Sequence, residues 1–510
     1  METTWLVLVT SFILAALAYL SIFVNKTSSR RNPPPGPKPW PIIGNLHQLG
    51  PLPHISLHKL SQKYGDLMLL KFGRRPVVVA SSPEMAKQFL KTHDLIFASR
   101  PETAAGKFIS YNYMDMSWAP YGPHWRQTRR ICVEELFNPK RLDSYEYIRV
   151  QERKDLISRL VAVSGRPITL REHLLRYSLS STGKMVPSDK YFSEKISTSS
   201  IVSLKALHEM LVEWFYLNGV VNLGDWIPWI GFLDVQGYVK RMKQLHKSLD
   251  EFLDIVLADH KAKFRETEDF VAEDMVDILL QQAEDPNIEI KLSTDSIKGL
   301  IQDLLAGGAD TSATLQEWAF NELLKHPEVL NKAREELDRV IGRERWVEEK
   351  DCAQLPYIES ILNETFRLHP LGTILAPHYS TQDCNVAGYD IAKGTTVWVN
   401  LWSIGRDPRN WELPDKFIPE RFMGKEFDIS GQNFSLLPFG SGRRRCPAYS
   451  LGVKIGRSTL ANLIHGFNWK LPENMKPEDV NMEEHFGLTT HPKFPLHVIV
   501  EPRLASHLYD

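Results

Sequence analysis

The chain has 510 residues, 43% of them apolar and 24% charged, and this length allows a large core in one or two domains. Its 61 Lys and Arg residues nearly balance its 62 Asp and Glu residues, which excludes the global basic field typical of nucleic-acid-binding proteins. The cysteines show neither paired nor finger-like spacing, which argues against a disulfide framework and a structural zinc site. They are Cys132, Cys352, Cys384 and Cys446, and we interpret the first three as packed or incidental.

The N-terminal segment is apolar, with twenty uncharged residues from Trp5 to Val24. A helix of this length rises about 30 Å and can cross a hydrocarbon core. Lys26, Arg30 and Arg31 follow it, so the positive-inside rule places the rest of the chain in the cytosol. The position of these charges and the length of the apolar run argue against a cleaved signal peptide. We therefore expect residues 1–31 to form a single-pass membrane anchor with a basic flank.

The remaining chain divides into a short hinge and one large region. Residues 32–45 are rich in proline and are expected to form a stiff, extended hinge. Residues 46–510 contain no repeat, and apolar residues at three- and four-residue spacing predict long helices over 82–97, 238–264, 293–326 and 326–342. Two β-hairpins are expected over 67–82 and 385–400. The fold class is therefore mainly α with small sheets (α+β), and the absence of Gly-rich nucleotide motifs argues against nicotinamide, flavin and ATP sites.

One cysteine lies in an unusual setting, the stretch "LLPFGSGRRRCPAYSLG" over residues 436–452. Gly440 and Gly442 allow a tight turn and a close approach to a flat ligand. The three arginines at 443–445 raise the local positive potential, which favours the thiolate of Cys446 over its thiol. Such a thiolate can act as a nucleophile or as the axial ligand of a haem iron, and this stretch alone leaves both open.

The segment "FGSGRRRCPA" resembles the haem-binding signature of the cytochrome P450 family, F-x-x-G-x-R-x-C-x-G. It matches at Phe439, Gly442, Arg444 and Cys446, and it departs from the pattern at Ala448, where the family has glycine. The resemblance implies that the four matching residues bind haem and that Cys446 is the axial ligand of its iron.

Two further segments resemble the same family in the same order. "NETFRLHP" and "FIPERF" imply that Glu364, Arg367 and Arg421 form a buried charged triad, in which the forked donors of an arginine are satisfied. The alternative is an ordinary surface ion pair along one helix.

A glycine-bearing helix carries the segment "AGGADTS" over residues 306–312. Two adjacent glycines weaken a helix by roughly 1 kcal/mol each, so they need a reason. The resemblance implies that the helix opens at Gly307 and Gly308 and that Asp310 and Thr311 deliver protons to the catalytic site. The alternative is a close helix crossing at small residues, with the threonine hydroxyl bonded back to the helix.

"WRQTR" over residues 125–129 also resembles the family. It implies that Trp125 and Arg129, which share one helix face, meet a haem propionate. Arg126 and Arg130, with Arg443 or Arg445, are then candidates for the surface that receives a reductase. The alternative for each of them is a solvated basic face.

The resemblance covers nearly the whole chain and is strongest with plant A-type membrane-bound members. It implies a haem-thiolate monooxygenase of the endoplasmic reticulum membrane, with haem b, O2, and electrons from NADPH through a separate reductase. The expected substrate is a lipophilic plant metabolite, such as a terpenoid or a phenylpropanoid- or alkaloid-derived aromatic. An oxygen-independent isomerase or dehydratase, and a haem electron carrier or gas sensor, are the alternatives. The expected substrate pocket comprises Phe108, Tyr111, Leu305, Ala306, Ala309, Leu371, Thr373, Ile374, Leu375, Leu488 and Thr489.

Overall fold

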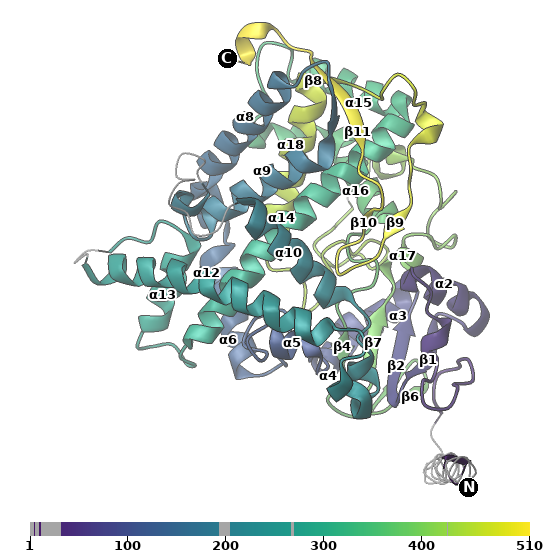
Figure 1. Cartoon of the computed structure of the whole chain (residues 1–510). Helices are drawn as coiled ribbons and strands as arrows, with labels where there is room; N and C mark the ends of the chain where they lie inside the picture. The colour runs from purple at the N-terminus through teal and green to yellow at the C-terminus, as the bar shows by residue number, and fades with distance from the viewer. Residues whose placement is uncertain are drawn as a thin grey trace.

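The computed structural model describes residues 32–192, 204–266, 270–425 and 427–509, together with Trp5, Thr10 and Ser11. Helices fill most of the molecule, and a small sheet lies at one side, near the point where the chain leaves the N-terminal segment (Figure 1). The expected anchor over Trp5–Val24 lies outside the described residues apart from those three. Among the residues that are described, no helix combines the length and apolar character of a membrane span.

The helices account for the long amphipathic stretches of the sequence. They are α2 (Pro53–Tyr64), α3 (Pro83–Lys87), α4 (Asp94–Phe97), α5 (Ala104–Phe108), α6 (Pro123–Ile131), α7 (Pro139–Ser144), α8 (Glu146–Ala162), α9 (Leu170–Met185), α10 (Leu204–Gly219), α11 (Leu223–Trp226), α12 (Tyr238–Glu266), α13 (Met275–Glu284), α14 (Thr294–Lys325), α15 (Pro327–Val340), α16 (Pro356–Leu368), α17 (Leu401–Ile404) and α18 (Tyr449–Gly466). Three of the four predicted long helices are confirmed as α12, α14 and α15. The helix expected over 82–97 is instead broken into α3, a π-helical turn (Gln88–Thr92) and α4.

The strands form four small sheets. They are β1 (Leu67–Phe72), β2 (Arg75–Ala80), β3 (Pro167–Thr169), β4 (His378–Tyr379), β5 (Cys384–Val386), β6 (Tyr389–Ile391), β7 (Thr396–Val399), β8 (Phe467–Lys470), β9 (Glu484–His485), β10 (His491–Pro492) and β11 (His497–Pro502). The largest sheet has the order β1-β2-β7-β4, in which β1 and β2 are the predicted hairpin and β7 lies parallel to β2. The hairpin expected over 385–400 is only partly correct: it comprises β5 and β6, whereas β7 is fully buried and joins the larger sheet.

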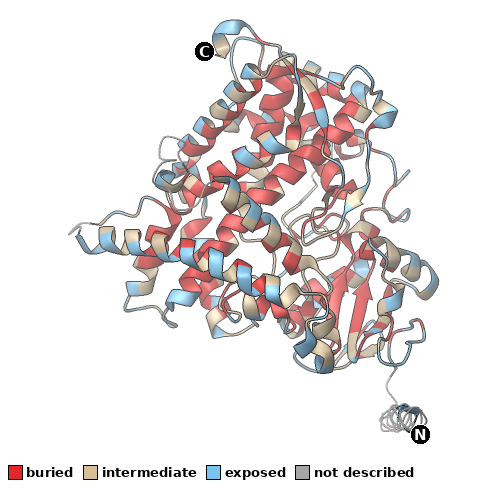
Figure 2. Cartoon of the chain, in the orientation of Figure 1, coloured by how far each residue is buried: buried red, intermediate tan, exposed pale blue. Residues whose placement is uncertain are grey.

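The core lies around α14, which runs through the middle of the molecule between α9, α16 and α18 (Figures 1 and 2). All but a few of its residues between Ser296 and Leu324 are buried, so the helix is apolar or internally satisfied on nearly every face. An added Cβ at Gly308 would lie 2.5 Å from the Thr182 hydroxyl of α9, so the absence of a side chain there allows the two helices to cross closely.

The proline-rich segment over 32–45, the expected hinge, is bonded to β1 and β6, which belong to two different sheets. The Leu69 N–H of β1 donates to the Pro35 carbonyl, and the Asn32 backbone N–H donates to the Asp390 carboxylate of β6. Residues 40–44 form a turn, in which the backbones of Trp40 and Gly44 exchange two hydrogen bonds at 3.0 Å, so the segment is not extended over its whole length. The described part of the hinge therefore has a defined path over the domain.

Candidate active site

Cys446 lies in a tight loop just before α18. Its N–H donates to the Phe439 carbonyl over 2.9 Å, and Gly440 and Gly442 have φ values of 70° and 68°, which glycine adopts without strain. A Cβ at Gly442 would lie 2.1 Å from the Leu90 carbonyl oxygen of the π-helical turn. The loop is therefore shaped by its glycines, and these hold the cysteine backbone close to the preceding helices.

Two cavities meet at this cysteine. The first, here called the inner cavity, has a volume of ≈ 320 Å³ and is lined by Cys446 together with Gly307 and Thr311 of α14. The second, here called the rear cavity, has a volume of ≈ 200 Å³ and is lined by the same three residues and by Ala448. Two segments that are distant in sequence, the cysteine loop and the middle of α14, thus border one space.

The two adjacent glycines of α14 have different roles. Gly308 makes the close crossing with α9, whereas a Cβ at Gly307 would meet nothing within 4 Å and would project into open space. The expected opening of the helix at these glycines is absent, since α14 is continuous and the Thr311 hydroxyl donates to the Gly307 carbonyl over 2.7 Å. The threonine hydroxyl is occupied by its own helix and must rotate to serve a ligand.

Burial raises the pKa of the Cys446 thiol, and the Ala448 N–H, Arg129 and Arg445 act against that rise. The expectation that three consecutive arginines favour the thiolate is thus only partly correct. The Arg443 guanidinium forms an ion pair with Asp94 at 2.8 Å, and Arg444 donates to backbone carbonyls. A thiol in this setting loses its proton fully only when it coordinates a metal ion.

A cluster of buried cations lies beside the inner cavity, and the Asp115 carboxylate attracts two of them, Arg100 and Arg444. Burial lowers the pKa of Arg444 to about 8 and that of Arg100 to about 10, and repulsion from Arg100 contributes to the effect on Arg444. The Arg444 guanidinium stacks 4.4 Å from the centroid of the Trp125 ring. Within the described chain, the buried Trp125 Nε1 has no hydrogen-bond partner, and Arg129 lies four residues further along the same helix. These groups are arranged to receive carboxylates from a bound molecule.

Two members of this region were missed by sequence reasoning. Arg100 lines the inner cavity and donates to the Ser117, Ala376 and Pro377 carbonyls. His378 also lines it, and burial lowers the pKa of its imidazole to about 3, so the ring is neutral and its Nδ1–H donates to the Phe97 carbonyl. In the sequence, each of these two residues is marked only as a basic residue next to a proline.

Glu364, Arg367 and Arg421 are brought together as expected. Arg367 donates two hydrogen bonds to the Glu364 carboxylate at 2.7 and 2.8 Å, and Arg421 Nε donates to it at 3.0 Å. Arg367 also donates to the carbonyls of Gly405, Pro414 and Lys416, and the side chains of Glu364 and Arg367 are fully buried. The triad therefore ties α16 to the segment that precedes the cysteine loop.

Asp310 and Thr311 are adjacent on α14, but their side chains have separate partners. Both carboxylate oxygens of Asp310 accept from His491 Nε2, at 3.0 and 3.1 Å, whereas Thr311 faces the two cavities. His491 lies on β10, and no sequence motif indicated it.

The structure brings only some residues of the expected substrate pocket to the inner cavity. Of its residues, Leu371, Ile374, Leu375, Leu488 and Thr489 line the inner cavity. Phe108, Tyr111, Leu305, Ala306, Ala309 and Thr373 do not. Tyr111 donates to Asp250, and Thr373 pairs with Thr490. The face of α14 toward the inner and rear cavities carries Leu304, Gly307, Gly308, Thr311, Ser312 and Leu315, so the predicted face was out of register along the helix.

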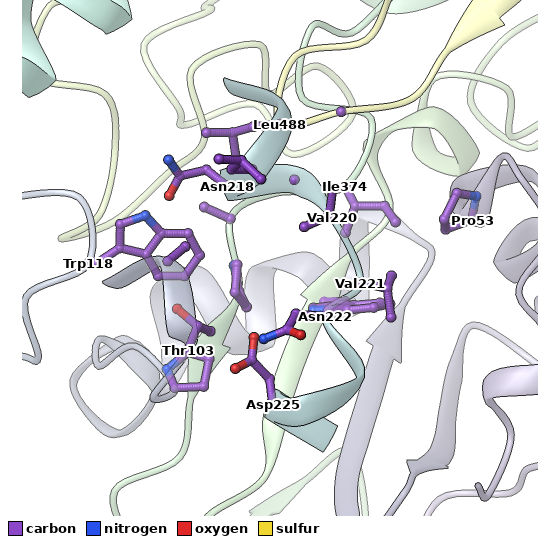
Figure 3. A pocket seen from close by; sticks show the side chains of 18 of the residues that line it. Pro53, Thr103, Trp118, Asn218, Val220, Val221, Asn222, Asp225, Ile374 and Leu488 are labelled. Carbon is purple, nitrogen blue, oxygen red and sulfur yellow. The ribbon is translucent and has the colours of Figure 1, made fainter. Parts of the chain in front are cut away.

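A third space, here called the outer cavity, adjoins the inner one and has a volume of ≈ 110 Å³. Ile374, Leu375 and Leu488 line both. In Figure 3 Leu488 and Ile374 lie along one side of this cavity, and Thr103 and Asp225 lie on the other. The outer cavity is thus apolar where it meets the inner one and polar at its far side.

The four candidate docking arginines differ in availability. Arg126, Arg130 and Arg443 are exposed, although Arg443 is paired with Asp94. Arg445 is half-buried, donates to the Ser430 carbonyl and lies 4.2 Å from the Tyr449 ring centroid. Of the four guanidinium groups, that of Arg445 is therefore the least available to a partner protein.

Together the fold and this site define a class: a helix-rich protein that holds a flat, anionic cofactor between a cysteine loop and a central helix. The family model described as Cytochrome P450 matches residues 34–497, so the chain belongs to the cytochrome P450 family. It is a haem-thiolate monooxygenase that uses haem b, O2 and electrons supplied by a reductase. The donor set fits haem b, because the two carboxylates of that group match the Trp125 Nε1, which has no partner among the described residues, and the neighbouring buried guanidinium of Arg444.

The chain is similar over nearly its whole length to several plant enzymes. A dimethylnonatriene synthase of Zea mays is 45% identical, with 94% of this chain and 92% of that protein covered. A trimethyltridecatetraene synthase of Zea mays is 44% identical, covering 94% and 90%, and a flavonoid 3'-monooxygenase of Petunia hybrida is 42% identical, covering 93% of each. Among solved structures, a zebra fish cytochrome P450 with progesterone has a TM-score of 0.73 at 26% identity, covering 88% of this chain and 99% of that one.

Proposed function

We propose that this monooxygenase oxidises an acyclic terpenoid of plant specialised metabolism, with Cys446 as the axial thiolate ligand. The observation that carries the proposal is that Cys446 and Thr311, from two distant elements, line one cavity that shares an apolar wall with a second cavity. When bound, haem b activates O2 with electrons that originate from NADPH. The chain supplies binding, orientation and protons.

The cofactor is held from several elements in this proposal. Trp125 and Arg129 of α6, Arg444 of the cysteine loop, and Arg100 hold its carboxylates. Phe439 and Gly442 shape the loop around Cys446. Asp310 and Thr311 then serve as the proton-delivering pair, because Thr311 lines the cavities and Asp310 is the neighbouring buried carboxylate.

The substrate class is inferred from shape and from the relatives. Leu371, Ile374, Leu375 and Leu488 give the inner cavity an apolar wall that carries no charge, and three of them extend into the outer cavity. An elongated, flexible hydrocarbon suits the adjoining inner and outer cavities better than a rigid polyphenol does. The two maize relatives are named for acyclic branched polyenes, which supports the terpenoid class for this chain.

Location and partner complete the proposal. Residues 1–31 anchor the protein in the endoplasmic reticulum membrane, residues 32–45 act as the hinge, and residues 46–510 form the cytosolic catalytic domain. The NADPH-dependent reductase docks near Arg126, Arg130 and Arg443, since exposed cations attract an acidic partner surface. Arg445 contributes least, because its guanidinium is already bonded.

The test is turnover by membranes that contain the full chain and a reductase, with acyclic terpenoids and flavonoids offered as separate panels. We expect the terpenoid panel to be oxidised, with strict dependence on O2 and NADPH. Turnover without either would establish the isomerase or dehydratase alternative, and oxidation of the flavonoid panel alone would refute the terpenoid proposal. Cys446→Ala should abolish the ferrous–carbonyl band, and a variant that retains both band and activity would refute the ligand assignment.

Ile374→Ala and Leu375→Ala test the orientation of the substrate. Each should retain the carbonyl band but alter the product ratio, because discrimination per methylene in an apolar pocket is worth roughly 1–3 kcal/mol. Ile404→Ala is the matched control, since Ile404 is buried but lines none of the three cavities. Parent-like product ratios in both pocket variants would show that this loop does not contact the substrate.

A further inference from the structure

The Asp310 carboxylate is held by a single side chain. Within the described chain its hydrogen-bond partner is His491, whose Nε2 lies 3.0 and 3.1 Å from the two carboxylate oxygens. The Asp310 side chain is 7% exposed and that of His491 is 21% exposed. The histidine thus connects a buried acid, one residue from Thr311, with solvent.

The position of His491 is set by its neighbours. The preceding residue, Thr490, donates its N–H to the Leu371 carbonyl at 2.7 Å, and its own carbonyl accepts from Trp318 Nε1 at 3.0 Å. Thr489, one residue further back, lines the inner cavity. The short β9–β10 hairpin is therefore anchored on α14, and His491 is held against Asp310.

Several titratable and charged groups face this pair. Glu317 of α14 lies near His491 but is already engaged by Arg171 of α9 at 2.6 Å, and Arg171 also donates to the Pro492 carbonyl. His208 of α10 lies near Asp310, and burial lowers the pKa of its imidazole despite that carboxylate. His485 of β9 is the cross-strand partner of His491, and burial, then His491, Arg171 and Lys493, lower its pKa. None of these groups replaces His491 as a bonded partner of Asp310.

We propose that His491 is the proton donor that recharges Asp310 during turnover, and this rests on the proposed function of Asp310. A protonated imidazole transfers its Nε2 proton to the carboxylate, and the neutral ring then takes another proton from solvent. Protonated Asp310 is no longer held by a charge, so it can turn toward the Thr311 side of the helix and deliver the proton. The substrate C–H bond becomes C–OH, the second oxygen atom leaves as water, NADPH supplies the electrons, and solvent supplies the protons through His491.

A histidine suits this position better than a permanent cation does. An arginine would pair with Asp310 equally well, but it does not release a proton in proteins. An imidazole changes charge between about pH 5 and 8, so it can both hold the carboxylate and recharge it. Proton delivery through His491 requires the protonated ring, so it should fall at alkaline pH.

The test compares variants at position 491 in the full-length protein with its reductase. His491→Gln retains an N–H that can bond to Asp310, and His491→Arg retains a cation. Neither side chain can release a proton to the carboxylate. Both should retain the ferrous–carbonyl band and the substrate-induced spectral shift, with product per NADPH about tenfold lower and peroxide correspondingly higher. Product per NADPH in the parent should fall at alkaline pH, and this fall should be absent from both variants. His485→Gln is the matched control, a histidine of the same hairpin without a bond to Asp310, and should behave as the parent.

Parent-like coupling and pH dependence in His491→Gln would overturn the proposal and leave His491 with a purely structural role. Asp310→Asn distinguishes this failure from that of the proposed function. If Asp310→Asn loses coupling while His491→Gln does not, the acid acts and receives protons elsewhere. If neither variant loses coupling while Cys446→Ala abolishes the carbonyl band, both the relay and the role of Asp310 are refuted but the haem site remains.

Discussion

Replacing Arg367 with methionine should destabilise the domain more than almost any other single substitution. The guanidinium donates five hydrogen bonds, two to Glu364 and three to backbone carbonyls, and both side chains of the ion pair are fully buried. Methionine has a similar length but leaves the Glu364 carboxylate with Arg421 and the Ile418 N–H alone. Removing one partner of a buried ion pair costs about 3–5 kcal/mol, because the other charge stays desolvated.

The assay is urea unfolding, followed by intrinsic fluorescence and by loss of the ferrous–carbonyl band. Arg367→Met should lower the unfolding midpoint sharply and reduce the fraction of protein that retains haem, and Arg367→Lys should follow it, because an ammonium cannot reach five acceptors. Arg343→Met is the matched control: Arg343 pairs with Asp338 at the surface, is 60% exposed, and should contribute about 0–1 kcal/mol. If Arg367→Lys unfolds with the parent's midpoint, the forked geometry is not what stabilises this region, and the argument fails.

Three further outcomes follow from particular contacts. Thr311→Ala should still consume NADPH but release several-fold more peroxide per product, and unchanged coupling would favour a purely helical role for this hydroxyl. Gly308→Ala should destabilise the domain by about 1–3 kcal/mol through its clash with Thr182, whereas Gly307→Ala should gain up to about 1 kcal/mol, as urea midpoints of the two variants will show. Burial raises the pKa of Asp225 to about 6, so the folded state retains a proton that the unfolded chain has lost, and this contribution to stability declines between about pH 4 and 6. Asp225→Asn should therefore become more stable relative to the parent across that window and keep a constant difference above it, and a pH-independent difference in unfolding midpoints would contradict the shift.

Much of the fold could be predicted from local pattern. The 3.6-residue periodicity over 238–264, 293–326 and 326–342 corresponds to α12, α14 and α15 within a few residues. It failed over 82–97, where the Asp94 carboxylate accepts from the Arg443 backbone and side chain and the helix restarts at that residue. A contact between segments so distant in sequence leaves no periodic pattern.

The candidate site also has a part that the sequence predicts and a part that it does not. Motif spacing was sufficient for Glu364 and Arg367, because residues three apart on a helix face the same neighbours. It was insufficient for the substrate pocket, because a helix that is apolar on nearly every face does not indicate which face borders the cavity. Leu305, Ala306 and Ala309 are accordingly buried in packing, away from the inner cavity.

The sequence by itself determined the cysteine loop, the charged triad and the family of this protein, since these depend on residue type at short spacing. Only the tertiary structure decided what each buried charge meets. Arg444, which stacks on Trp125, lines the same cavity as Arg100, and His491 reaches Asp310 across 181 positions of the chain. The physical reason is that burial makes an unpartnered charge costly, so folding must bring distant groups together, and which groups meet is set by how the helices pack.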